Sequence, residues 1–180
     1  LADAGVQQRL LGQAAQAAGN EAIALGTRVS AAGNGSVALG TNAVANSAAH
    51  GSFVFGDRST TADIVSFAPN EFNARAAGGV RFFTDASHTA GVVLSAGSSS
   101  WASLSDAAMK ENFRVVDGED VLTKLARVPI RTWSYKAQAA SIRHMGPTAQ
   151  DFRAAFGLGD FPLRINTVDA DGVALAALKA

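Results

Sequence analysis

Short strands recur along the first third of the chain, because apolar residues alternate with small ones in segments that end at glycine. Residues 19–27 (GNEAIALGT) are repeated fourteen positions later by residues 33–41 (GNGSVALGT), and residues 50–57 (HGSFVFGD) form a looser copy. The large apolar residues of each copy lie two positions apart, which is the period of a strand with one buried face. Each repeat therefore predicts one strand and one glycine turn, and the fixed period predicts stacked coils.

Three coils of this length are too few to bury a large core in one chain. A coil closes its core only against its neighbours, and about three coils are the minimum for stability. The chain is 48% apolar but only 7% aromatic, with alanine and small aliphatic residues supplying most of the apolar fraction. This composition suits thin, repetitive structure, so we expect the coils to associate with other copies of the chain.

Residues 58–104 are predicted to form a β-rich connector. Residues 72–76 and 80–83 would be strands joined by a hairpin turn at the Gly78-Gly79 pair. Strands this short leave unpaired edges in a single chain. Intertwining with sister chains would cover those edges, so the connector also favours an oligomer.

Charged residues and helical spacing appear after Trp101. The pattern first predicts a short amphipathic helix behind the acidic start at residues 117–120 (DGED), ended by Pro129, and then a strand over residues 130–135. It further predicts a helix from about Pro147 to Phe156, stopped by Gly157, and a helix from Asp171 to the end. We therefore expect an α+β segment after the β-rich part.

Charge and composition exclude several classes of function. Fifteen basic residues balance fifteen acidic ones and no basic block occurs, so nucleic acid is not an expected partner. No run of 18 apolar residues occurs, so no membrane contact is expected within this fragment. The chain starts at Leu1 without a signal-peptide pattern, and we interpret it as a fragment of a longer protein.

No cofactor or metal is expected either. Cysteine is absent, which excludes disulfides and thiolate metal sites, and His50, His88 and His144 are scattered along the chain. The motifs of nucleophile elbows and phosphate-binding loops are also missing. A conventional small-molecule enzyme is therefore excluded as the main interpretation.

One segment places a candidate nucleophile near a candidate base. Ser105 precedes Lys110 by five residues, and a Ser-Lys pair can perform acyl transfer when burial favours the neutral amine. On a continuous helix the two would lie about 140° apart, so Ser105 must lie at or before the helix start. Ser105 followed by Asp106 also fits an ordinary helix N-cap, and spacing alone leaves that alternative open.

The repeats resemble the head repeats of trimeric autotransporter adhesins. The resemblance rests on residues 36–40 (SVALG) and 42–45 (NAVA), and it covers roughly residues 19–57. It implies a left-handed parallel β-roll in each of three chains. A generic β-solenoid without an adhesive role of its own is the alternative.

Residues 70–180 resemble the C-terminal chaperone domain of endosialidase-type phage tailspikes and its bacterial relatives. Four ordered blocks carry the resemblance: SD with KEN at 105–112, TWSY at 132–135, RHMGPTAQDF at 143–152 and VDADGVALAA at 168–177. The resemblance implies a domain that trimerises and assists assembly of the fibre upstream. It also implies that the domain then cuts itself off through a Ser-Lys dyad.

Carried onto this chain, the resemblance implies that the scissile bond is Leu104-Ser105, with Ser105 as nucleophile and Lys110 as general base. His144 would support the site, although a buried structural role fits it equally well. The remaining polar residues of the segment fit cap and turn roles better than catalysis: Asp106 and Asn112.

The expected fold is therefore mixed, with adhesin-head-like β-roll repeats at 1–57, a β-rich connector at 58–104 and an α+β chaperone domain at 105–180. The expected assembly is a homotrimeric fibre on a bacterial cell surface or phage virion, with a cell-surface or glycan receptor as its outside partner. A structural fibre tip that never cuts is the first alternative. A membrane-tethered transcription factor is disfavoured by the repeats and the missing basic region.

Overall fold

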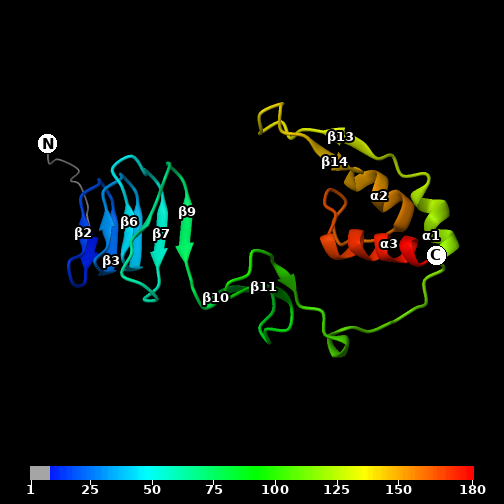
Figure 1. The fold of residues 1–180 in the computed structure, drawn as a ribbon, viewed down its shortest axis with the longest axis horizontal. Coiled ribbons are helices and arrows are strands. Elements are labelled where there is room, and N and C mark those ends of the chain that lie inside the picture. Colours follow the sequence, from blue (N-terminus) through cyan, green and yellow to red (C-terminus); the bar gives the residue numbers. More distant parts are fainter. Residues whose placement is uncertain (1–8) are drawn as a thin grey trace, which may run out of the picture. The chain divides into compact units, whose positions relative to one another are not determined.

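The computed structural model of the chain describes residues 9–180. These residues belong to two compact units, the first reaching to Leu104 and the second running from Ser105 to Ala180. The first unit consists of β-structure alone, whereas the second combines three helices with a two-stranded sheet (Figure 1). The expected mixed fold is therefore confirmed, with a β-rich first part and an α+β second part.

Stacked parallel strands build a solenoid in the first unit, as the sequence period predicts (Figure 1). One sheet contains β1 (Arg9–Leu11), β3 (Ile23–Thr27), β5 (Val37–Thr41), β7 (Phe53–Gly56) and β9 (Phe72–Arg75). The second sheet contains β2 (Gln16–Ala17), β4 (Ser30–Ala31), β6 (Ala43–Ala45) and β8 (Ile64–Val65). Each repeat thus supplies two strands rather than one, because strands of two or three residues are too short to show a period.

The solenoid extends beyond the repeats that the sequence reveals. β1 pairs in parallel with β3 ahead of the first repeat, and β9 pairs in parallel with β7 after the last one. The segments RLL and FNAR do not follow the repeat motif, although they occupy its place in the sheet. Part of the segment expected to be a connector therefore completes the solenoid.

Burial along the strands is the reverse of what residue size suggests. Ala24, Ala38 and Val54 are fully buried, whereas the larger Ile23 and Leu25 beside Ala24 are only half-buried. The coils are narrow, and stacked glycine backbones line one corner, where an added Cβ on Gly26 would overlap the carbonyl oxygen of the next coil. Only small side chains fit such an interior, so the large apolar ones lie on the outer face.

The prediction of a hairpin turn at Gly78-Gly79 is wrong. β10 (Gly79–Phe83) pairs antiparallel with β11 (Gly91–Ser95), and β12 (Ala102–Ser103) completes this separate sheet. The glycine pair therefore links the solenoid to a different sheet instead of turning β9 back on itself. A two-residue hairpin of the common type needs positive φ at both central residues, and only Gly79 has one, at +96°.

Besides a short 3-10 helix, the second unit contains three α-helices and a two-stranded sheet: α1 (Gly118–Leu125), α2 (Ala149–Phe156), α3 (Thr167–Lys179), β13 (Arg131–Trp133) and β14 (His144–Gly146). Asp117 caps α1 by accepting from the amides of Glu119 and Asp120, and the left-handed Gly157 ends α2 as predicted. α3 starts four residues earlier than Asp171, because its interior tolerates a glycine. Within residues 9–180, no helix combines the length and apolarity needed to cross a membrane.

Candidate functional site

The candidate site begins where the two compact units divide. Leu104 is the last residue of the first unit, and its amide donates a hydrogen bond of 3.2 Å to the carbonyl oxygen of Gly91 in β11. Ser105 opens the second unit. The Leu104-Ser105 bond therefore has its carbonyl side tied to a β-sheet, while its amine side leads into a different folding unit.

A short 3-10 helix turns the chain back on itself directly after Ser105. This helix, η1 (Ala107–Met109), has Asp106 as its N-cap, whose carboxylate accepts a 2.9 Å hydrogen bond from the amide of Ala108. Asp106 itself is extended, with φ −66° and ψ 134°. Ser105 thus lies before the helix start, in the position that the spacing argument requires, and Asp106 has a capping role.

This turn brings the two predicted dyad residues together. The Nζ atom of Lys110 donates a hydrogen bond to Oγ of Ser105 at 2.5 Å. No carboxylate forms an ion pair with Lys110 among residues 9–180. The hydroxyl is therefore the hydrogen-bond partner of the amine, and the two heavy atoms lie within reach of proton transfer, although Lys110 is the donor in this contact.

Water reaches every residue around this contact in the single chain. Residues 95–117 are all exposed, including Ser105 and Lys110. Large apolar side chains flank the dyad in the same exposed state, among them Leu104, Met109 and Phe113. The dyad geometry is thus present in one chain, but the burial that favours a neutral lysine is not.

The structure does not bring His144 to this site. Its ring stacks on Trp133 at a centroid distance of 4.9 Å, meets Tyr135 edge-on at 5.2 Å, and its Nε2 lies 2.9 Å from Oε1 of Gln138. No hydrogen bond or ring contact joins it to the dyad within the part of the chain that the structure describes. These contacts fit the structural alternative for His144, as a support of the β13–β14 hairpin.

Two further features of the segment bear on the site. Asn112 adopts a left-handed backbone conformation with φ +58°, which is a turn geometry rather than a catalytic contact. The hydrogen bond between the Leu104 amide and the Gly91 carbonyl was not predicted from the sequence, because no motif marks a backbone hydrogen bond between residues so far apart.

Across residues 9–180, no cluster of His, Asp and Glu side chains is arranged to hold a metal ion.

Comparison with known proteins gives one match. Residues 105–159 match the family model described as the chaperone of endosialidase, a peptidase family whose members cleave themselves. No curated protein and no solved structure matched the chain. The matched stretch starts at Ser105 and covers less than half of the chain, leaving the solenoid outside it. The first part of the second unit, residues 105–159, is therefore similar to the chaperone domain of endosialidases.

Proposed function

We propose that this chain is the C-terminal part of a homotrimeric surface or virion fibre, whose residues 105–180 drive trimer assembly and then release themselves by cleaving Leu104-Ser105. One coincidence carries the proposal. The division between the compact units, the first residue of the family match and the Ser-Lys contact all fall at this bond. A releasable chaperone needs its cut at the edge of its own fold.

The proposed chemistry uses only this chain and water. Lys110, as the neutral amine, accepts the hydroxyl proton of Ser105 while Oγ attacks the carbonyl carbon of Leu104. The C–N bond breaks as Lys110 returns the proton to the leaving amine of Ser105, which leaves an ester between the two residues. Water then hydrolyses the ester, giving a new carboxylate at Leu104 and restoring the hydroxyl of Ser105.

Assembly would complete the site. A lysine acts as a base when it is desolvated, and in the single chain Lys110 is exposed. Neighbouring chains that cover Leu104, Met109 and the 73%-exposed Phe113 would bury apolar surface and exclude water from the dyad in one step. Cleavage would therefore follow trimer formation, when the chaperone is no longer needed.

Exposed apolar residues support association of several copies. Phe67 is 86% exposed, Phe72 is 71% exposed and Leu178 of α3 is 85% exposed. Monomeric soluble proteins rarely leave so many large apolar side chains in water, and such surfaces mark interfaces. Three copies are proposed because both resemblances imply threefold assembly. Within each copy, the proposed segments are the repeats at 1–57, the connector at 58–104 and the chaperone domain at 105–180.

The proposed location is outside the cell, on a phage virion or a bacterial surface, with a cell-surface or glycan receptor as the partner of the fibre. A fibre tip that assembles through the same domain but never cuts is the second candidate. The intact mass of the purified, assembled chain separates the two. The proposal predicts one fragment that ends at Leu104 and one that begins at Ser105, whereas the second candidate predicts a single uncut mass.

A further inference from the structure

A polar groove follows one corner of the solenoid, where the coils turn from the first sheet toward the second. Thr27 and Thr41, which end β3 and β5, lie side by side in register along it. The groove has a volume of about 620 Å³ and is lined by hydroxyl and amide side chains together with Arg28 and Arg58. Among residues 9–180, no carboxylate lines it. Its chemistry differs from that of the apolar outer face of the strands.

An enlarged turn of the last coil forms one wall of this groove. Gly40 pairs with Gly56 and Ala43 pairs with Ile64, so a turn of two residues in one coil becomes a turn of seven in the next. The extra residues supply Ser59, Thr60 and Thr61 to the lining. The preceding coil closes with a turn of two residues, so closing a coil does not require the five extra residues. Surface loops of this kind often carry binding residues.

Arg28 is held in place on the opposite side. Its Nε donates a 2.7 Å hydrogen bond to Oδ1 of Asn42, which is only 1% exposed, and Nδ2 of Asn42 donates to the carbonyl oxygen of Thr60 at 3.0 Å. The two terminal nitrogens of the guanidinium have no hydrogen-bond partner among residues 9–180. The Arg28 backbone is left-handed, with φ +51°, a conformation that disfavours arginine. A fixed guanidinium therefore presents free donors to the groove.

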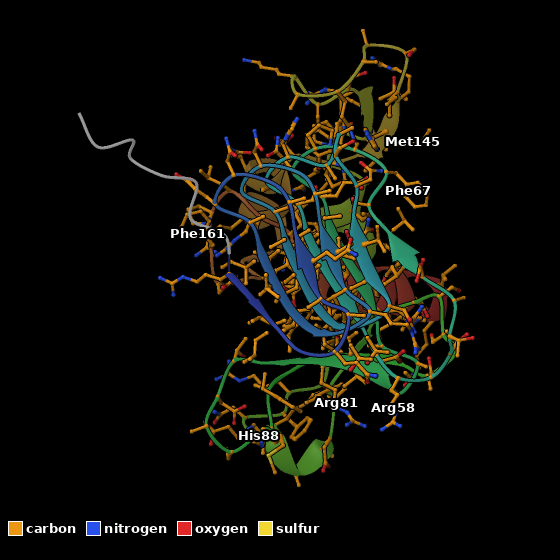
Figure 2. The ribbon with its side chains drawn as sticks, turned by 90° about the vertical axis from the view of Figure 1, so that its left-hand side faces the viewer. Arg58, Phe67, Arg81, His88, Met145 and Phe161 are labelled. Carbon is orange, nitrogen blue, oxygen red and sulfur yellow. The ribbon has the colours of Figure 1, made fainter. Side chains whose placement is uncertain are left out.

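Arg58 is also free to bind an anion. It forms no ion pair or side-chain hydrogen bond in the described residues, and it lies at the periphery of the stacked coils (Figure 2). Its neighbour Asp57 is occupied elsewhere, since its carboxylate accepts from Nε of Arg75 at 3.0 Å, from Oγ of Ser59 at 2.6 Å and from the amide of Ala77. The closest carboxylate in sequence is thus already satisfied by other donors.

Arg28 directly follows β3 and Arg58 lies two residues after β7, so the two arginines leave the same sheet two coils apart, the second from the enlarged turn. Asn42 follows β5, the strand between β3 and β7, and stacked parallel strands are spaced by about 4.8 Å, so the strand ends that precede Arg28 and Arg58 are separated by roughly 10 Å along the stack. A single small anion can engage one of them at a time. An extended sugar chain with an acidic group on alternate residues can reach both, because one disaccharide spans a comparable length.

We propose that this groove binds an acidic saccharide. Carboxylate or sulfate groups on the sugar would pair with the guanidinium groups of Arg28 and Arg58, the geometry that guanidinium favours. Sugar hydroxyls would exchange hydrogen bonds with Thr27 and Thr41, whose hydroxyls both donate and accept, and would donate to Oγ of Ser59, whose own proton is given to Asp57. This inference rests on the glycan receptor proposed above and specifies its chemical class, but the site lies in the first unit and needs no cleavage, so a failure to cut Leu104-Ser105 would leave it standing.

Titration calorimetry on the full chain at low salt tests the proposal. The probes are a galacturonate hexamer, a chondroitin sulfate hexamer, neutral maltohexaose and inorganic sulfate. We expect at least one acidic hexamer to bind, with weaker binding as salt is raised, and maltohexaose to show none. Arg28→Gln and Arg58→Gln should each weaken binding about tenfold, while Arg9→Gln, which removes a charge elsewhere on the solenoid, should leave it unchanged.

Three outcomes would overturn the proposal. These are failure of both acidic hexamers to bind, equal binding by wild type and both groove variants, and binding of sulfate as tight as that of the hexamers, which would reduce the groove to a simple anion site. Circular dichroism melting checks the fold of each variant. Arg28→Gln alters a buried hydrogen bond, so if it melts early, Arg58→Gln, which has no such bond to lose, decides the result.

Discussion

Lys110 donates a hydrogen bond of 2.5 Å to Ser105 across five residues, in a segment where no side chain is buried. The contact is local, because the cap at Asp106 and the 3-10 helix behind it form it without help from the rest of the chain. Its surroundings are not local. One chain therefore supplies the geometry of the Ser105–Lys110 contact, whereas assembly would supply the burial of Lys110.

Assembly should depend on the second unit. We expect the full chain, kept uncut by Ser105→Ala, to sediment at about three times its mass of 18.4 kDa, and a chain that ends at Leu104 to give mainly aggregate when expressed alone. The reason is that interchain β-pairing forms slowly and exposes unpaired edges. Sedimentation velocity on both chains measures this. A stable monomer of the full chain at micromolar concentration, or equal yields of soluble trimer from both chains, would refute the chaperone role.

The inverted burial of the solenoid predicts opposite behaviour for two neighbouring residues. Ala38→Leu places a large side chain in a narrow, fully buried position and should lower the free energy of unfolding by about 1–3 kcal/mol. Leu39→Ala changes the outer face and should weaken association more than it weakens the coils. Chemical denaturation and concentration-dependent sedimentation measure the two effects. A larger loss of coil stability from Leu39→Ala than from Ala38→Leu would contradict the assignment of faces.

Acid should loosen the last coil of the solenoid. The hydroxyl of Ser59, the amide of Ala77 and the guanidinium of Arg75 hold the pKa of Asp57 well below its ordinary value of 3.8. A depressed pKa means that the folded state binds this proton less readily than the unfolded state. The stabilisation is therefore complete above pH 3.8 and is lost as the pH falls through the lower folded value.

Asp57→Asn tests this linkage. At neutral pH the variant should melt below wild type, because Arg75 loses its charged partner, and the difference should shrink as the pH falls below 3.8. Melting followed by circular dichroism between neutral and acidic pH gives the comparison. A difference that stays constant or grows toward low pH would rule out Asp57 as the source.

The sequence period was sufficient to predict the stacked strands but not which residues face inward. Alternation defines two faces, and the choice between them depends on the width of the coil, which stacked neighbours such as Gly26 and Gly40 determine. Ala24 is inside for this reason, although Leu25 is more apolar. Local signals worked better in the second unit, where the αL residue Gly157 ended a helix as predicted.

The candidate site shows the same division between local and long-range information. The contact between Ser105 and Lys110 follows from a short motif and a cap, so sequence could anticipate it. The surroundings of His144 depend on the pairing of β13 with β14, which brings its ring against Trp133, and the sequence does not predict this pairing. The groove could not be predicted from the sequence, because the stacking of the coils and the enlarged turn after β7, which no motif marks, bring Arg28 and Arg58 into its lining.

Cleavage at Leu104-Ser105 is the central claim, and intact-mass spectrometry of the assembled protein tests it most directly. The chains compared are wild type, Ser105→Ala, Lys110→Ala and two controls that remove the same side chains elsewhere, Ser103→Ala and Lys136→Ala, both exposed. The account predicts that wild type and both controls divide into a fragment ending at Leu104 and one beginning at Ser105, while the two dyad variants remain uncut trimers. Cleavage of both dyad variants as efficient as that of wild type, or a wild-type trimer that stays whole through prolonged incubation, would contradict it.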